Sequence, residues 1–296
     1  MKSAVFEEKL IHTLIARSEE ELCISGDWIP VNNQPRVRVL KLQKEDCRLM
    51  PLVYPRDYEE RFEEGETVET LADEILSNIQ KAQELPGIPL DFFEDYQAVR
   101  ERIYCKVISA DKNRELLNCV PCEYHEDLAI VYYFEFPKDT MEGATILIRN
   151  EHLELWDCSA EEISSKAWRN TLAVKKTRFM KLSQVLAGFG LEETEEMEQN
   201  PLYMLSNEDG SFGAAVAFYP GVLAKCALQL GSNLILLPCS IHEWLLIPSG
   251  AAEASKRAEE LRCMVRDINR TQVAEKEVLS DEVYYYDLET DQIRVL

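Results

Sequence analysis

The segment from Pro201 to Pro248 constrains the fold most strongly, because it is the most apolar part of a very acidic chain. Two apolar runs, at 203–205 and 212–219, flank a polar turn and together predict a pair of strands. Gly221 then precedes apolar residues at helical spacing, and two further short strands close the segment. This order of elements is typical of a compact unit of strands covered by a helix. It contains no motif that identifies a reaction.

The rest of the chain alternates between helical periodicity and short apolar strands. A loop is expected at 26–35, where Gly, two Asn and two Pro fall close together, and a capping box at Ser159–Glu162 opens one helix. We therefore expect an α+β fold of mainly antiparallel sheets with helices packed on one side. The other expected helices are 4–17, 67–79, 92–100, 114–117, 151–156, 221–230 and 252–269. The expected strands are 37–42, 49–54, 103–108, 128–136, 144–148, 234–237, 244–247, 283–286 and 293–296, besides the pair already described.

A glutamate-rich segment at 187–200 is the expected boundary between two regions of the chain. A charge run of this kind is typical of a solvated loop or helix end. We therefore expect an N-terminal α+β region at 1–186 and a C-terminal α+β region at 200–296. The C-terminal region is expected to run strand, strand, helix, strand, strand, helix.

Two short segments suggest an internal repeat. Residues 143–146 and 213–216 each follow an apolar strand and a polar turn, and each leads into a helix. One hypothesis is that the two regions contain related hairpin-plus-helix units. The alternative is that small residues simply recur after tight turns. Different strand arrangements in the two segments would contradict the repeat.

The charge balance limits the partners that such a chain can have. Its 296 residues include 54 acidic and 32 basic side chains, for a net charge of −22. Nucleic acid and anionic membranes require clustered Lys and Arg, so neither partner is expected. No window approaches a membrane span, and the first residues lack the apolar run of a signal peptide. Nine scattered cysteines indicate reduced thiols, so we expect a cytoplasmic protein, and its oligomeric state stays open.

Cys119 and Cys122, followed by His125, are the candidates for a metal or redox site. A Cys-x-x-Cys turn brings two sulfur atoms to one side of the chain, where they can hold zinc or form a redox pair. A zinc site needs four ligands, and no second pair with metal-binding spacing follows. A thioredoxin-type pair should open a helix, whereas this one follows a short helix and precedes a strand. We therefore interpret the cysteines as structural and expect no metal.

Ser240, His242 and Glu243 are the candidates for a catalytic site, because they interrupt apolar strands. A hydroxyl nucleophile, an imidazole base and an orienting carboxylate are the groups of a hydrolase. On a regular strand only Ser240 and His242 would share a face, and they would lie too far apart for a direct bond. No Gly-x-Ser-x-Gly elbow surrounds the serine, and no nucleotide-binding motif occurs. No cofactor is therefore expected.

Several segments together resemble an uncharacterised bacterial family, DUF5688. The resemblance covers most of the chain from about residue 30 onward. It implies a bacterial cytoplasmic protein and brings no activity or catalytic residues. The family usually has Pro-His-Arg near 121–123, so the resemblance implies that Cys119 and Cys122 are peculiar to this sequence, which argues against a metal or redox role for them. The segments are FFEDY (92–96), DLAIVY (127–132), ATILI (144–148), HLELW (152–156), YPG (219–221), LPCSIHE (237–243), NRTQV (269–273) and LSD (279–281).

From these observations we expect a non-catalytic cytoplasmic protein that binds another protein as an adaptor. A secretion-chaperone-like role is a specific version, by analogy of element order in the last third of the chain. The alternative is a hydrolase-like enzyme with a site around Ser240, His242 and Glu243. An enzyme should have a pocket lined by convergent polar groups. An interaction protein should instead have an exposed apolar patch or an unpaired sheet edge.

Overall fold

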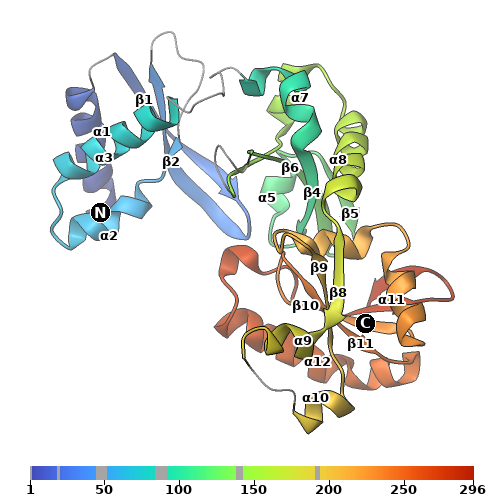
Figure 1. Ribbon diagram of the computed structural model, residues 1–296. Helices are drawn as coiled ribbons and strands as arrows, with labels where there is room; N and C mark the ends of the chain where they lie inside the picture. The colour runs from blue at the N-terminus through green and yellow to red at the C-terminus, as the bar shows by residue number, and fades with distance from the viewer. Residues whose placement is uncertain (1, 19–20, 45–51, 84–91, 138–142, 191–193) are drawn as a thin grey trace. The chain divides into compact units, whose positions relative to one another are not determined.

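The computed structural model describes residues 2–18, 21–44, 52–83, 92–137, 143–190 and 194–296 (Figure 1). The chain forms two compact units, described separately below. Unit 1 comprises Met1–Val99 with Phe136–Gly143, and unit 2 comprises Arg100–Glu135 with Ala144–Leu296. All strand pairs are antiparallel, and helices pack against the sheets, which confirms the expected α+β class.

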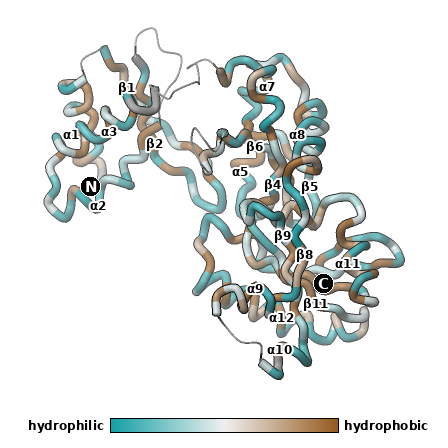
Figure 2. Tube along the Cα trace, in the orientation of Figure 1, coloured by the Kyte–Doolittle hydropathy of each residue, from teal (hydrophilic) through white to brown (hydrophobic). Residues whose placement is uncertain are grey.

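Unit 1 is a three-stranded sheet with helices packed against it, in the strand order β1-β2-β3. Its core joins α1, α3 and the sheet through buried side chains that include Leu10, Leu40 and Leu71. Figure 2 shows hydrophobic and hydrophilic residues alternating along these helices, as expected for helices that bury one side. The elements are α1 (Lys2–Arg17), β1 (Leu22–Val31), β2 (Gln34–Lys44), β3 (Leu52–Val53), α2 (Arg56–Glu63), α3 (Val68–Gln83), η1 (Phe92–Glu94) and α4 (Tyr96–Val99).

The expectation of a loop at 26–35 was wrong, because most of this segment belongs to β1. β1 and β2 form a long hairpin that closes between Val31 and Gln34. Asn33 adopts the left-handed conformation there, with φ at 55°, which asparagine tolerates in tight hairpin turns. β1 lies at the edge of its sheet, where Pro30 does not interrupt a ladder of hydrogen bonds. The Asn residues of this segment do lie in the hairpin turn. Strand β1, however, continues to Val31, through most of the segment that was expected to be a loop.

Unit 2 contains two antiparallel sheets. The smaller has the order β4-β6-β5, with β7 also paired to β6, and the larger has the order β13-β12-β10-β11-β9-β8. Helix α12 packs on the larger sheet through buried residues such as Leu261 and Val265. The elements of the first half are η2 (Arg100–Arg102), β4 (Ile103–Ser109), α5 (Arg114–Leu117), β5 (Cys122–His125), β6 (Leu128–Glu135), β7 (Thr145–Leu147), α7 (Asn150–Trp156) and α8 (Ala160–Val174). They continue with β8 (Thr177–Lys181), α9 (Leu182–Ala187), α10 (Glu195–Gln199), β9 (Tyr203–Asn207), η3 (Gly213–Phe218), α11 (Val222–Leu230), β10 (Leu234–Pro238), β11 (Trp244–Pro248), α12 (Ala251–Thr271), η4 (Glu275–Glu277), β12 (Tyr284–Asp287) and β13 (Gln292–Val295).

The second strand expected at 212–219 is instead the 3-10 helix η3. β9 already pairs with β8 on one side and with β11 on the other, so it has no free edge for another strand. Residues 213–217 of η3 are buried because the helix packs into unit 2, with the Ala214 carbonyl accepting the Trp244 indole N–H at 2.8 Å. The region therefore does not begin with two consecutive strands, contrary to the expected order.

The same observation contradicts the repeat of hairpin-plus-helix units. Residues 145–147 form β7, which pairs with β6, whereas 213–218 are helical. The expected division near 187–200 lies between β8 and β9, which pair directly in one sheet. Residues 191–193 of that segment lie outside the described part of the chain. The chain passes from one compact unit to the other after Val99, after Glu135 and after Gly143 instead.

Candidate functional site

The turn from Cys239 to Glu243 joins β10 to β11 and carries the three candidate catalytic residues. The Ser240 hydroxyl donates a hydrogen bond to Glu243 Oε1 at 2.8 Å and accepts one from the His242 backbone N–H at 3.0 Å. The Cys239 N–H donates to the Glu243 carbonyl at 3.2 Å. The fold therefore brings Ser240 and Glu243 into contact, and this contact stabilises the turn.

The His242 imidazole belongs to a different set of contacts. Its Nδ1 accepts the backbone N–H of Phe212 at 3.0 Å, and the two rings stack with centroids 5.7 Å apart. The His242 carbonyl accepts the Ser206 hydroxyl at 2.8 Å. In a hydrolase the imidazole would accept the serine proton, whereas Ser240 donates that proton to Glu243. The arrangement anchors the turn to the Phe212 segment and does not form a serine–histidine pair.

Phe212 itself has an unusual backbone. Its φ is 53°, in the left-handed region that bulky side chains rarely adopt. Gly213 follows it in close contact, since a Cβ atom there would lie 2.1 Å from Ser206 Oγ and 2.4 Å from the His242 carbonyl oxygen. The backbone next to Phe212 is therefore tightly packed. Such strain persists only where the surrounding structure enforces it, and it is enriched at functional sites.

The Phe212 ring faces the amine of Lys106, on strand β4. Lys106 Nζ lies 4.7 Å from the centroid of the Phe212 ring and 5.8 Å from that of Tyr133. The Phe212 and Tyr133 rings pack edge to face, 4.8 Å apart. Burial lowers the pKa of the Lys106 amine to about 8. Lys106, Tyr133, Phe212 and His242 are called the Lys106 cluster below.

A second buried lysine of unit 2 is fully compensated. Lys175 Nζ lies 2.6 Å from a Glu135 carboxylate oxygen and 2.8 Å from one of Asp209, and 4.9 Å from the Tyr104 ring. Burial lowers the pKa of this amine, but the two carboxylates outweigh burial and the pKa is raised overall. Lys175 is therefore a structural cation that stays charged.

Glu123, on β5, is a half-buried carboxylate surrounded by donors. It accepts hydrogen bonds from the hydroxyls of Tyr132 and Ser164. Burial raises its pKa, but the hydrogen bonds from Ser164, Tyr132 and Trp168 outweigh burial, so the pKa lies below its usual value. A carboxylate held in this way is a poor proton acceptor. Its role is to join β5 and β6 to helix α8.

Asp127 joins the two sheets of unit 2. Its carboxylate accepts the Ser280 hydroxyl at 2.6 Å and the Tyr284 hydroxyl at 2.5 Å. Nearby, Lys112 forms an ion pair with Asp281 at 3.2 Å. Burial, followed by the Asp127 charge, raises the pKa of the Tyr284 phenol well above its usual value. These contacts connect residues far apart in the sequence and are structural.

The candidate metal ligands do not converge on one point. Cys119 Sγ lies 3.6 Å from the Glu115 carbonyl and Cys122 Sγ lies 4.0 Å from that of Leu117, so both thiols face helix α5. The His125 ring packs on a phenylalanine, with centroids 5.0 Å apart. Within the described ranges, no group of three or more His, Cys, Asp or Glu side chains could hold a metal ion.

Unit 1 carries a groove among its helices. The groove has a volume of 670 Å³, lies between α1 and the start of α3, and is open to solvent. Phe62 and Val68 contribute its apolar surface, while Glu8, His12 and Glu69 contribute polar groups. Its volume suits a small molecule. None of its polar groups is a buried side chain directed inward, so the groove does not define a chemistry.

Sequence reasoning missed Lys106 and Glu123. Lys106 carried a usable signal, since it is a lone cation within the apolar run 103–108. Glu123 has no recognisable sequence signal, because the hydroxyl groups that donate hydrogen bonds to it come from distant positions such as Ser164. Phe212 was assigned to a strand, and a left-handed aromatic residue has no sequence signature. The Lys106 cluster exists only through tertiary contacts.

Comparisons with known proteins give one match. Among the described residues, no helix has both the length and the apolar character needed to cross a membrane. No curated protein and no solved structure matches the chain. A family model described as a family of unknown function, DUF5688, matches residues 3–288. The match spans nearly the whole sequence, so the chain belongs to the DUF5688 family of unknown function.

Proposed function

We propose that this protein is a non-catalytic interaction protein that binds an extended, acidic segment of a partner protein along the edge strand β8. The observation that carries the proposal is an open sheet edge at which Lys176 and Arg178 form no ion pair with a carboxylate of the described residues. β8 ends the six-stranded sheet, and among the described residues it pairs with β9 alone. Partner strands commonly add to such edges through backbone hydrogen bonds.

The hydrogen-bond pattern identifies the free side of β8. The Lys176 carbonyl accepts the Glu208 N–H at 2.9 Å, and the Leu182 N–H donates to the Leu202 carbonyl at 2.7 Å. Backbone groups alternate in direction along an antiparallel strand. Since residues 176 and 182 face β9, the backbone groups of Thr177 and Phe179 face away from it. An added strand would bond to these groups.

The side chains of β8 suit an acidic partner. Lys176 and Arg178 are exposed. Lys176 Nζ donates to the Leu172 carbonyl at 3.2 Å, and Arg178 Nε contacts Met180 Sδ at 3.2 Å. Within the part of the chain that the structure describes, neither forms an ion pair. In a chain of net charge −22, uncompensated cations on an open edge favour an external acidic segment.

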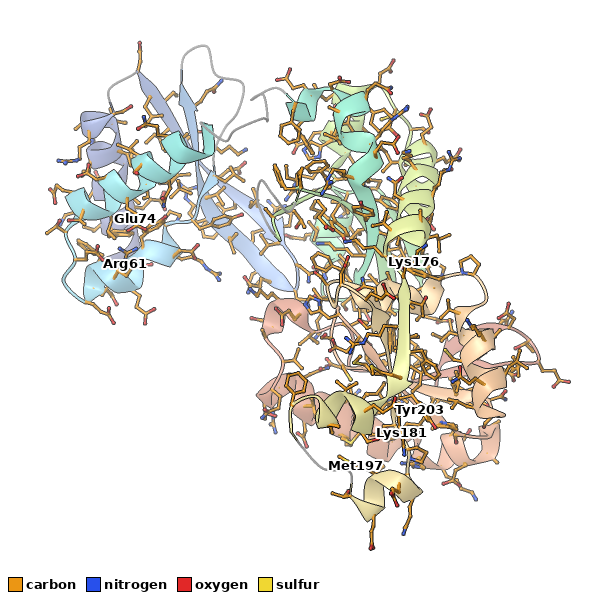
Figure 3. All side chains as sticks on the ribbon, in the orientation of Figure 1. Arg61, Glu74, Lys176, Lys181, Met197 and Tyr203 are labelled. Carbon is orange, nitrogen blue, oxygen red and sulfur yellow. The ribbon has the colours of Figure 1, made fainter. Side chains whose placement is uncertain are left out.

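Apolar groups beside the edge would add contact area. The Phe179 ring stacks on Tyr203 of β9, with centroids 5.5 Å apart. Val174, just before β8, is 53% exposed. Figure 3 shows Lys176 near one end of the strand and Lys181 near the other, with Tyr203 beside Lys181. An extended segment of about five residues would span this distance.

A bacterial cytoplasmic location belongs to the same proposal. The eight cysteines that the structure describes are free thiols, including the exposed Cys23 and Cys263. Free exposed thiols suit a reducing compartment. A hydrolase around Ser240 receives no support from the geometry, because the serine hydroxyl is bonded to Glu243.

Peptide binding tests the proposal. A fluorescein-labelled peptide of alternating glutamate and valine should bind the full-length protein, as measured by fluorescence anisotropy at low ionic strength. An alternating lysine–valine peptide should not bind. On binding, hydrogen exchange should slow at the Thr177 and Phe179 amides. Absence of binding and unchanged exchange at both amides would contradict the proposal.

Two substitutions separate the contributions of charge and backbone. Arg178→Glu should weaken peptide binding about tenfold, or about 1.4 kcal/mol, because it reverses a charge at the edge. Thr177→Pro should weaken it comparably by removing an outward N–H. Lys256→Glu, an exposed charge reversal on α12, is the matched control and should have little effect. If Arg178→Glu instead causes only self-association, the cations serve to protect the edge from aggregation.

A further inference from the structure

We infer that Lys106 is a nucleophilic amine that condenses with the carbonyl group of a small aldehyde or ketone to form an imine. This inference concerns a small-molecule site and is independent of peptide binding along β8. It rests on the aromatic enclosure of the amine, on the lack of a compensating carboxylate, and on the strained residue that completes the enclosure.

The enclosure is built by residues of unit 2. Lys106 lies on β4 opposite Val131, and two residues earlier Tyr104 lies opposite Tyr133. Residues two apart on a strand share a face, so the Lys106 amine and the tyrosine rings project from one side of the sheet. Phe212 covers the amine from the loop before η3, with its ring centroid 4.7 Å from Nζ. The Lys106 residue as a whole is half-buried.

The amine lacks the partners that an internal cation normally has. In the part of the chain described by the structure, Lys106 Nζ has no hydrogen bond or ion pair, and it lies over the faces of the Phe212 and Tyr133 rings. Lys175 of the same unit has two carboxylates within 2.8 Å. The fold therefore neutralises one buried ammonium group and leaves the other without a counter-ion. Desolvation without a counter-ion is a recognised way to make a lysine nucleophilic.

The consequence for reactivity follows from protonation. Burial lowers the pKa of Lys106 to about 8, so about half of the amines are neutral at pH 8. For an ordinary lysine the neutral fraction at that pH is about 0.4%. Only the neutral amine attacks a carbonyl carbon. A substantial fraction of Lys106 is therefore present as the neutral, nucleophilic amine near neutral pH, whereas Lys175 stays protonated.

The strained segment explains how the enclosure is maintained. The Phe212 N–H donates to His242 Nδ1 at 3.0 Å, while Gly213 fits against Ser206 without space for a Cβ atom. These contacts hold Phe212 at a φ of 53°. The His242 imidazole is thus a positioning group for the aromatic wall.

The covalent step balances without another reactant. The neutral Lys106 nitrogen attacks the carbonyl carbon, and a proton moves from nitrogen to the former carbonyl oxygen. That oxygen then leaves as water when the carbon–nitrogen double bond forms. No electrons are gained or lost overall, and the step is reversible. The faces of Phe212 and Tyr133 would stabilise the protonated imine as they stabilise a cation.

Reductive trapping tests the inference on the full-length protein. The protein is treated with limiting acetaldehyde and sodium cyanoborohydride at pH 7, and ethylated lysines are quantified by peptide mass spectrometry. Lys106 should be labelled at least tenfold faster than the exposed Lys256. Its labelling rate should reach a plateau above about pH 8, whereas that of Lys256 should continue to rise toward pH 10. Lys175 should be labelled slowly throughout.

Variants link the reactivity to the enclosure. His242→Gln and Phe212→Ala should slow labelling of Lys106 and move its plateau to higher pH, without affecting Lys256. Circular dichroism verifies that each variant is folded. The wild-type measurement decides the question even if a variant does not fold. Labelling of Lys106 no faster than Lys256, or with the same pH dependence, would overturn the inference.

Discussion

Two lysines of unit 2 show how surroundings set the chemistry of one residue type. Lys175 lies between Glu135 and Asp209, and its ammonium form is stabilised. Lys106 lies over the ring of Phe212 without a carboxylate partner among the described residues, and burial lowers the pKa of its amine to about 8. Both lie near tyrosine rings, so the aromatic contact does not distinguish them. The presence of carboxylates decides which amine is structural and which is available for chemistry.

The lowered pKa of Lys106 predicts a pH dependence of stability. Folding disfavours the protonated amine, so this cost is complete below about pH 8 and disappears as the pH rises toward the unfolded value near 10.4. Relative to Lys106→Met, the wild type should gain on the order of 2 to 3 kcal/mol between pH 7 and pH 10.5. Urea denaturation of both proteins at the two pH values measures this. Equal pH dependence of the two proteins would contradict it.

At the scale of elements, the segment after β9 shows how sheet pairing overrides local propensity. Val216 and its neighbours suit a strand, yet β9 has β8 and β11 on its two sides. The segment therefore turns into η3, and Gly213 allows it to approach Ser206 and His242. This placement also brings Phe212 over Lys106. The geometry of a single connection thus determines the candidate site.

Gly213→Ala should destabilise unit 2 by about 3 kcal/mol or more. The added Cβ would lie 2.1 Å from Ser206 Oγ, 2.4 Å from the His242 carbonyl oxygen and 2.7 Å from the Asn207 nitrogen, and two of these atoms are backbone. Overpacking of a well-packed site typically lowers the free energy of unfolding by about 1–3 kcal/mol, and occasionally by more. Gly250→Ala is the control, because its Cβ would have no atom within 4 Å. In thermal unfolding, Gly213→Ala should unfold at a clearly lower temperature than Gly250→Ala. Similar unfolding temperatures would contradict the expected clash at Gly213.

At the scale of the whole molecule, the chain forms two units of different construction. Unit 1 has a small sheet with helices, and unit 2 joins two sheets through contacts between distant residues. Asp127 of the smaller sheet region accepts the hydroxyls of Ser280 and Tyr284 near the larger one. These bonds connect the first half of unit 2 to its second half.

Asp127→Ala should lower the unfolding free energy by about 2 to 4 kcal/mol, because two largely buried hydroxyls lose their acceptor. Adding Tyr284→Phe should cost less in this background than in the wild type, since the phenol has already lost its partner. Urea unfolding followed by tryptophan fluorescence measures both effects. Strictly additive effects would show that the two residues do not act together.

Helix and strand periodicity were readable from the sequence over most of the chain, because burial imposes them locally. The opening helix, the capping box at Ser159 and Glu162, and the long α12 all followed from residue spacing. β1, η3 and β8 did not follow from residue spacing. Whether such a segment forms a strand or a helix depends on which sheet edges the other strands leave open.

The candidate site depended even more on tertiary contacts. The sequence predicts a possible catalytic site at the turn with Ser240 and His242. In the structure, Ser240 bonds to Glu243 and His242 accepts the backbone N–H of Phe212, so the turn holds Phe212 in place. Lys106 and Phe212 are separated by more than a hundred positions, and only packing brings the ring over the amine. Local spacing determines elements, because backbone geometry is local. The environment of a titratable group is decided by the folded chain, because charge, solvent access and ring contacts act through space.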